Sequence, residues 1–171
     1  MNETFKPKVG EYAPYYESYI KRVINENIDK LLLTQIQEVR SYFETMGEEK
    51  SNETYAEGKW TAKEVLSHMI DTDRIMTFRA LCFARGEKSP LPSFDQDEYV
   101  ARSMANAIPL NKLIEDFEFS RYACVSLLKT LPIDSWSNIG MASGYEVSVR
   151  ALFYIMTGHV AHHLAILKER Y

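Results

Sequence analysis

Three histidines occur at a spacing that suits metal binding. His159 and His163 are four residues apart, so a helix places them above one another on one face, and His68 lies in a second apolar segment with helical periodicity. Neutral imidazole is the commonest metal ligand in proteins. The pattern therefore predicts a divalent metal site that two helices share.

Apolar neighbours indicate which way these rings point. The inward-facing stripe around the pair is Leu152, Ile155, Met156, His159, His163 and Ile166. Two imidazoles thus occupy positions that packing would give to leucine, and an unpaired buried imidazole is costly to desolvate. A polar partner is required, and His68 is the candidate; the alternative is that each ring is a hydrogen-bonded core histidine. Three protein ligands would leave a fourth position open, as in catalytic sites.

The identity of the metal is less well defined than its ligands, because imidazole binds zinc, nickel, iron and copper. We expect one divalent ion per chain, with zinc as the first assignment and nickel as the second. His162 is displaced by about 100° from His163 around the helix, so it is expected to point elsewhere.

Asp71 follows His68 by about one helical turn, and two roles are open to it. It could accept a hydrogen bond that fixes an imidazole tautomer, or carry a proton in catalysis. It could equally form a local ion pair with Arg74 or Arg79. We treat Asp71 as the candidate catalytic residue.

Further residues are candidates for substrate binding. Arg79 and Arg150 carry planar guanidinium groups, which suit anionic groups of a substrate. Trp60 and the segment Phe94–Asp97 are candidate rims of a substrate pocket, although Trp60 would pack equally well beside a helix start.

Four long helices are predicted to position these side chains. Their approximate ranges are 25–46, 61–85, 110–131 and 148–171. Thr61 and Glu64 can form a capping box at the start of the second helix, and Ser148 can cap the fourth. Helices of about 22 residues are roughly 30 Å long and bury their apolar stripes most simply against one another. The expected fold is an all-α four-helix bundle.

Two segments outside these helices are distinctive. The connection 86–109 is long for a loop in a compact domain, which indicates either a functional loop or a short extra helix near residues 97–104. Residues 1–24 form an aromatic amino-terminal arm, whose tyrosines are Tyr12, Tyr15, Tyr16 and Tyr19. We expect this arm to pack on the bundle as a cover, and a dimer contact is the alternative.

Length and composition fit one domain over residues 1–171. Hydrophobic residues make up 46% and charged residues 26%, which excludes a largely disordered chain. The net charge of −4 gives no positive field for a phosphate backbone, so nucleic acid is not an expected partner. No apolar run approaches the roughly 18 residues of a membrane span, and Cys82 and Cys124 are expected to be free thiols. We expect a cytoplasmic location without membrane association.

Blocks of sequence around these residues resemble a known family. They cover residues 58–71, 79–81, 94–95, 143–152, 158–163 and 168–171, so nearly the whole domain takes part. The chain resembles the DinB/YfiT-like superfamily, in particular the DinB-like domain proteins. This resemblance implies an up-down-down-up four-helix bundle, often dimeric, with His68, His159 and His163 as ligands of a divalent metal.

Proteins of this kind differ in activity. Some are labelled metal-dependent hydrolases, and others transfer low-molecular-weight thiols such as bacillithiol or mycothiol to electrophiles, or isomerise a thiol adduct. The first hypothesis is therefore a metal-dependent enzyme for a small-molecule substrate, in which the ion lowers the pKa of a water or a thiol. The alternative is a non-enzymatic protein, either a metal-binding module or a dimeric scaffold of the stress response.

Overall fold

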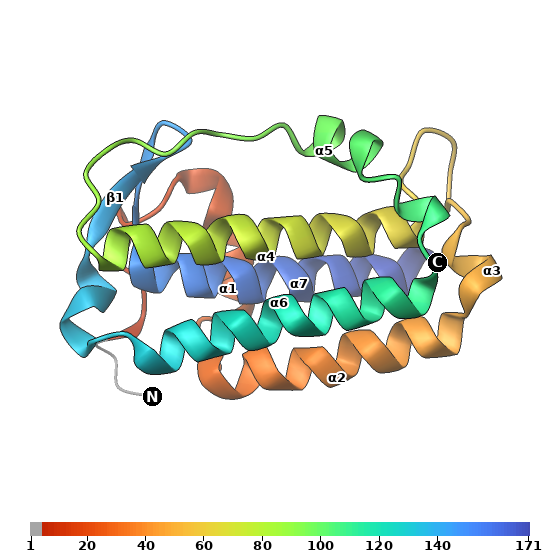
Figure 1. Cartoon of the computed structure of the whole chain (residues 1–171). Coiled ribbons are helices and arrows are strands. Elements are labelled where there is room, and N and C mark those ends of the chain that lie inside the picture. Colours follow the sequence, from red (N-terminus) through yellow and green to blue (C-terminus); the bar gives the residue numbers. More distant parts are fainter. Residues whose placement is uncertain (1–4) are drawn as a thin grey trace.

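Four long helices lie side by side in the structure, a computed structural model that describes residues 5–171 (Figure 1). These helices are α2 (Ile28–Met46), α4 (Ala62–Ala84), α6 (Leu110–Thr130) and α7 (Val149–Arg170). The chain colours in Figure 1 show that α2 and α7 run in one direction and that α4 and α6 run in the other. The expected up-down-down-up four-helix bundle is confirmed.

Side-chain caps fix the helix starts close to the predicted positions. The Thr61 hydroxyl accepts a hydrogen bond from the Glu64 backbone N–H at 3.1 Å, and the Glu64 carboxylate accepts one from the Thr61 N–H at 2.7 Å. The Ser148 side chain accepts a hydrogen bond from the Ala151 backbone N–H. The first long helix begins at Ile28, three residues later than predicted, because the Asn27 side chain caps it.

The long connection after α4 follows from the parallel course of α4 and α6. A helix of about 23 residues is roughly 34 Å long, so the chain must return over that length before a parallel neighbour can begin. Figure 1 shows this segment crossing back along the bundle and forming α5 (Gln96–Ser103) on the way. The short helix predicted near residues 97–104 is thereby confirmed.

Several short elements were not predicted. They are α1 (Glu17–Val23), α3 (Glu48–Ser51), the 3-10 helices Pro14–Tyr16, Ala105–Ala107 and Ile133–Ser137, and the strands β1 (Ile139–Ala142) and β2 (Tyr145–Ser148). The two strands form an antiparallel hairpin around Ser143 and Gly144, whose positive φ angles of 54° and 80° suit a two-residue turn. Strands of four residues are too short to produce a clear period-two pattern.

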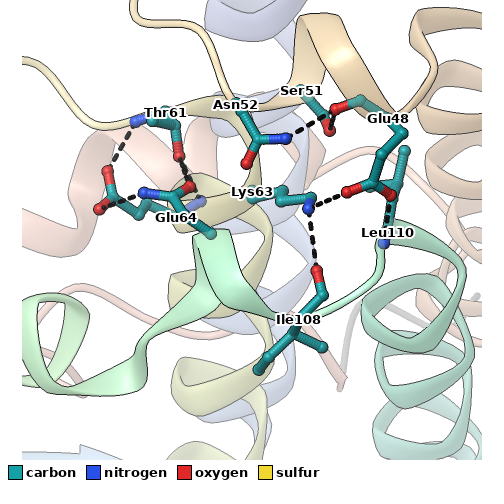
Figure 2. Close-up of polar contacts among 9 residues, drawn as sticks. Glu48, Ser51, Asn52, Thr61, Lys63, Glu64, Ile108 and Leu110 are labelled. Carbon is teal, nitrogen blue, oxygen red and sulfur yellow. Dashed lines mark hydrogen bonds and ion pairs between the residues drawn. The ribbon is translucent and has the colours of Figure 1, made fainter.

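A cluster of hydrogen bonds holds the end of the bundle where α4 and α6 begin (Figure 2). The buried Lys63 ammonium donates to the Glu48 carboxylate and, at 2.9 Å, to the Ile108 carbonyl. Glu48 also accepts a hydrogen bond from the Leu110 backbone N–H at 2.8 Å. Because this cluster adjoins the Thr61 cap, it also fixes the start of α4 and with it the backbone of the preceding Trp60.

The apolar core is divided into two clusters along the bundle. On α7 the first cluster ends at Met156 and the second begins at Val160. Four fully buried polar side chains lie between the clusters, one on each long helix: Gln35, Asp73, Arg121 and Thr157. We call these four residues the polar layer. His159 lies beside this layer, at the same interruption of the apolar core.

Contacts within the polar layer connect three helices to α7. The Gln35 side-chain amide donates to the Thr157 carbonyl at 2.9 Å, and Arg121 donates to the Met156 carbonyl at 3.2 Å. Arg121 and Asp73 form an ion pair at 2.6 Å, with both side chains wholly buried. Burial raises the pKa of Asp73 to about 6, and the adjacent Arg121 opposes this rise because its positive charge favours the carboxylate.

Within residues 5–171, no helix has the length and apolar character that crossing a membrane requires.

Removing one partner of the buried ion pair should cost more than removing both. We expect Asp73→Leu and Arg121→Met each to lower the free energy of unfolding by about 3–5 kcal/mol, because each leaves an uncompensated buried charge. The double variant, which leaves neither charge, should be more stable than either single variant. Urea unfolding of the four proteins measures this cycle, and additive losses would contradict an energetically coupled pair.

Candidate metal centre

The three predicted histidines converge in the structure. His68 comes from α4, and His159 and His163 come from successive turns of α7. The Nε2 atom of His159 lies 2.9 Å from Nε2 of His68 and 3.0 Å from Nε2 of His163. One ring nitrogen from each histidine lies within 4.8 Å of the other two. Among the described residues, these three side chains form the group that could hold a metal ion. Nitrogens bound to one tetrahedral zinc are about 3.3 Å apart, so the spacing is close to that of a ligand set.

All three rings are held in the neutral form that binds metals. Burial lowers the pKa of His68 to about 4 and that of His163 to about 3. The pKa of His159 is well below its usual value, chiefly through burial and then through the neighbouring His163 and His68. No proton therefore has to be displaced from a charged imidazole at pH 7 when an ion binds.

Hydrogen bonding alone does not satisfy the His159 ring. A ring nitrogen of a neutral imidazole offers either one proton or one lone pair, so Nε2 of His159 cannot make two good hydrogen bonds to both neighbouring rings. Within residues 5–171, its buried Nδ1 has no hydrogen-bond partner. Such a ring at 4% exposure is unfavourable unless something compensates it. A divalent cation that accepts the three Nε2 lone pairs would remove the conflict at Nε2 and leave the ring proton on Nδ1, and the residues present fit one.

Aromatic rings enclose the cluster from two sides. The Tyr19 ring meets the His159 ring edge to face, with centroids 5.4 Å apart, and the Trp60 ring lies 5.0 Å from that of His68. Tyr19 belongs to α1, which packs on α7 at Gly158. A Cβ at Gly158 would overlap the Tyr19 carbonyl and lie 3.0 Å from its Cα. The glycine therefore permits the close approach that brings Tyr19 to the cluster.

Two cavities border the histidines. The first, which we call the tyrosine chamber, has a volume of about 300 Å³ and is lined by Tyr15, Tyr16, Tyr19, His68, Thr72, Met76, Ser93, Phe94, Gln96, Ser143, Ile155 and His159. The second, which we call the Trp60 cleft, has a volume of about 250 Å³ and is lined by Tyr55, Gly58, Lys59, Trp60, Val65, Asp97, His163, Ile166 and Tyr171. A larger open groove of about 780 Å³ between α2 and the end of α7 is lined by none of the three histidines.

Asp71 lies outside this arrangement. It lines neither the tyrosine chamber nor the Trp60 cleft. Its pKa is raised by burial and by Asp116, and Arg74 opposes this rise. Arg74 itself bonds to Asp116 at 2.5 Å. These neighbours favour the local electrostatic role that the sequence left open over a role at the histidines.

The predicted arginines are engaged in structural contacts. Arg79 donates to the Pro92 carbonyl at 2.7 Å and to the Ser143 hydroxyl at 3.0 Å, so it ties the returning connection and the hairpin to α4. Arg150 is bound by the Glu11 carboxylate at the start of α7. Nine residues separate Arg150 from His159, which is about 13 Å along the helix. The structure therefore does not bring either guanidinium to the cluster.

Trp60, by contrast, lines a cavity beside the histidines. This position agrees with its prediction as part of the rim of a substrate pocket. His162 lies near the cluster but outside the ligand group, half-buried against Tyr19 with ring centroids 5.2 Å apart.

Sequence reasoning missed some of the residues that shape the site. Thr72 lies four residues after His68 and lines the tyrosine chamber, a position that the same helical-face argument could have identified. Gly158 was available as a signal, because a glycine inside a helix costs stability unless close packing requires it. The arm tyrosines were predicted as a cover, and Tyr12, Tyr16 and Tyr19 do pack against the core. The lining of a cavity by Tyr16 and Tyr19 depends on the position of α1, which was not predicted.

Comparison with known proteins places these observations in a family context. The model of the DinB superfamily matches residues 31–167. A protein from Oceanobacillus iheyensis, provisionally named a metal-dependent hydrolase, is 28% identical over 144 residues, covering 78% of this chain and 81% of its own length.

Two solved structures share the fold. YfiT from Bacillus subtilis, reported as a probable metal-dependent hydrolase with an unusual four-helix bundle topology, superposes with a TM-score of 0.76 at 15% identity, covering 96% of this chain and 90% of that one. A mycothiol-dependent maleylpyruvate isomerase superposes with a TM-score of 0.70 at 16% identity, covering 86% of this chain and 62% of that one.

The packing of α1 on α7 makes Gly158→Ala a sharp test. Helix propensity alone predicts that alanine stabilises the protein by about 1 kcal/mol. Because the new methyl group overlaps the Tyr19 backbone, we expect the free energy of unfolding to fall instead, by about 1–2 kcal/mol net. Denaturant unfolding measures the sign, and a more stable variant would contradict the packing described here.

The neutral histidines predict a pH dependence for the metal-free protein. The unfolded chain protonates these rings near pH 6.5, whereas the folded chain protonates His68 only near pH 4. The folded protein therefore binds fewer protons in this window, and each such histidine lowers the free energy of unfolding by about 1.4 kcal/mol per pH unit as the pH falls. In His68→Leu, the free energy of unfolding should fall by about 1.4 kcal/mol less per pH unit than in the unmodified protein. Urea unfolding with chelator present measures both slopes. Parallel curves for the two proteins would refute the assignment.

Proposed function

Because this chain belongs to the DinB superfamily, we propose that it is a metal-dependent enzyme that activates a water molecule or a low-molecular-weight thiol at His68, His159 and His163. The observation that carries this proposal is the convergence of three neutral imidazoles, two buried and one half-buried, that hydrogen bonding among themselves cannot satisfy. When bound, a divalent ion would act as a Lewis acid that lowers the pKa of the nucleophile.

The protein's own residues would prepare the site for that chemistry. Three neutral imidazoles supply nitrogen ligands and leave at least one coordination position for a nucleophile or substrate. Trp60 and Tyr19 shield the rings on two sides and limit the access of bulk water. The tyrosine chamber and the Trp60 cleft supply space for a small molecule next to the nitrogens.

Relatives support both nucleophiles in the proposal. The Oceanobacillus protein and YfiT carry names of metal-dependent hydrolases, which use water, and the isomerase uses mycothiol, which is a thiol. Zinc is our first assignment for the ion and nickel the second, because both accept imidazole ligands and the group contains no thiolate.

A homodimer is part of the proposal, and exposed apolar side chains support it. Phe78 and Leu81 on α4 and Phe119 and Tyr122 on α6 have exposed fractions between 39% and 69%. The ion pair between Arg74 of α4 and Asp116 of α6 lies about one helical turn before Phe78 and Phe119. Because the two helices are parallel, the four apolar side chains then lie on neighbouring outer faces. A surface patch of this kind is typical of a protein interface.

A non-enzymatic protein of the stress response is the competing function, either a metal-binding module or a dimeric scaffold, and the same exposed patch favours the scaffold. The scaffold would function without a bound ion. We also propose the cytoplasm as the compartment, on the support of Cys82 and Cys124, which are free thiols.

Metal content separates these functions. After reconstitution, elemental analysis should find about one zinc or nickel ion per chain, and His68→Ala, His159→Ala and His163→Ala should each abolish binding. His162→Ala is the matched control, because its ring is adjacent but outside the ligand group, and it should retain the ion. Full occupancy in all three ligand variants would refute the assignment.

The nucleophile can be identified with the metal-reconstituted protein. Electrophiles should be assayed in parallel with glutathione, cysteine, bacillithiol and water alone. We expect turnover with at least one nucleophile and its loss, to the background rate, in His163→Ala and after chelation. Metal binding without turnover under any of these conditions would favour the non-enzymatic metal-binding module.

A further inference from the structure

The lining of the tyrosine chamber is uncharged. In the part of the chain that the structure describes, its walls contain four aromatic rings, those of Tyr15, Tyr16, Tyr19 and Phe94, and two other apolar side chains. The remaining side chains apart from the histidines are the neutral polar groups of Thr72, Ser93, Gln96 and Ser143. No carboxylate, ammonium or guanidinium group belongs to the lining. The Trp60 cleft differs, because Lys59 and Asp97 both line it.

The Arg79 guanidinium lies behind the chamber wall and bonds to two side chains of the lining, Tyr16 and Ser143. Arg79 is only 3% exposed, and its side chain bonds to the Pro92 carbonyl and the Ser143 hydroxyl. The guanidinium carbon lies 6.0 Å from the centre of the Phe94 ring. Arg79 thus supports the wall of the chamber, and its donors are taken up by Pro92, Ser143 and Tyr16 instead of being offered to a ligand inside it.

Thr72 supplies a polar atom without a partner. Its side chain is 4% exposed, and within residues 5–171 its hydroxyl makes no hydrogen bond, although a helical threonine commonly bonds to the carbonyl four residues earlier. It lies one turn from His68 and lines the same cavity. A neutral polar group of a ligand could form a hydrogen bond with this hydroxyl without burying a charge. A charged group that is buried without a partner costs much more free energy of desolvation.

We propose that the tyrosine chamber binds an uncharged, largely aromatic part of the substrate and discriminates against charged groups in that part. This inference rests on the proposed function only in taking the histidines as the reacting end of the site. A volume of about 300 Å³ is at the lower end of small-molecule sites, so the group is one or two rings in size. The reacting group faces the histidines, and the uncharged tail fills the space between Tyr19 and Phe94.

A series of phenylmethanethiols tests the proposal, because the thiol can bind the ion while the para substituent probes the chamber. The substituents are methyl, carboxylate and aminomethyl, the last being a cation at pH 7. Dissociation constants are measured by NMR with zinc-loaded and with metal-free protein. We expect the para-methyl compound to bind about tenfold more tightly than either charged compound in both forms, because burying an unpaired charge costs well over 1.4 kcal/mol. Equal or tighter binding of the carboxylate in the metal-free protein would overturn the proposal.

A charge placed in the wall locates the binding. Gln96→Glu adds a carboxylate to the chamber with little change in shape, and it should tighten binding of the aminomethyl compound several-fold and weaken that of the carboxylate. Gln37→Glu makes the same change in the open groove beside α2 and should leave all constants unchanged. Dissociation constants that are unchanged by Gln96→Glu but altered by Lys59→Met would place the ligand in the Trp60 cleft. This result would refute the assignment of the ligand to the tyrosine chamber. Elemental analysis reports zinc binding separately, and the metal-free series tests the chamber even if the histidines hold no ion.

Discussion

Burial of polar rings in the middle of an apolar bundle is the constraint on which this structure depends. The two apolar clusters stop short of each other, and every long helix places a polar side chain in the gap. Gln35 and Arg121 satisfy carbonyls of α7, and Asp73 balances the charge of Arg121. His159 differs from these residues, because its Nε2 faces two other imidazole rings and cannot make a good hydrogen bond to both. A bound cation that accepts the Nε2 lone pairs resolves this conflict, which connects the packing of the core to the chemistry of the site.

The unusual helix order has a direct consequence for that site. Because α4 and α6 are parallel, the chain returns along the bundle (Figure 1). On its way this segment supplies Phe94 and Gln96 to the cavity that His68 and His159 also line. An antiparallel pair joined by a short loop would leave this face without such a wall. The opposite wall comes from α1. Because Gly158 has no side chain, the backbone of α1 can lie in contact with that of α7. Two segments outside the four long helices thus complete the tyrosine chamber, whose remaining walls come from α4, α7 and the hairpin.

Much of this could be predicted from sequence, for identifiable reasons. Helical periodicity and local caps such as Thr61 with Glu64 gave the long helices to within a few residues, since both signals are local. The convergence of His68 with His159 was accessible because both occupy apolar stripes that face one core. The pairing of Arg74 with Asp116 and the contacts of Arg79 with Pro92 and Ser143 were not accessible, because they depend on which segments pack against α4. The hairpin and α1 escaped prediction because each is short and is held by tertiary contacts, such as the approach of Tyr19 to Gly158.

The central claim is that three imidazole nitrogens from two helices bind one ion. The most direct measurement is X-ray absorption spectroscopy of the zinc-loaded protein, which reports the number and type of atoms around the metal. We expect three imidazole nitrogens at about 2.0–2.1 Å, with one or more oxygen ligands, such as solvent, completing the shell. A spectrum with fewer than three imidazoles, or one unchanged in His159→Ala, would contradict the account.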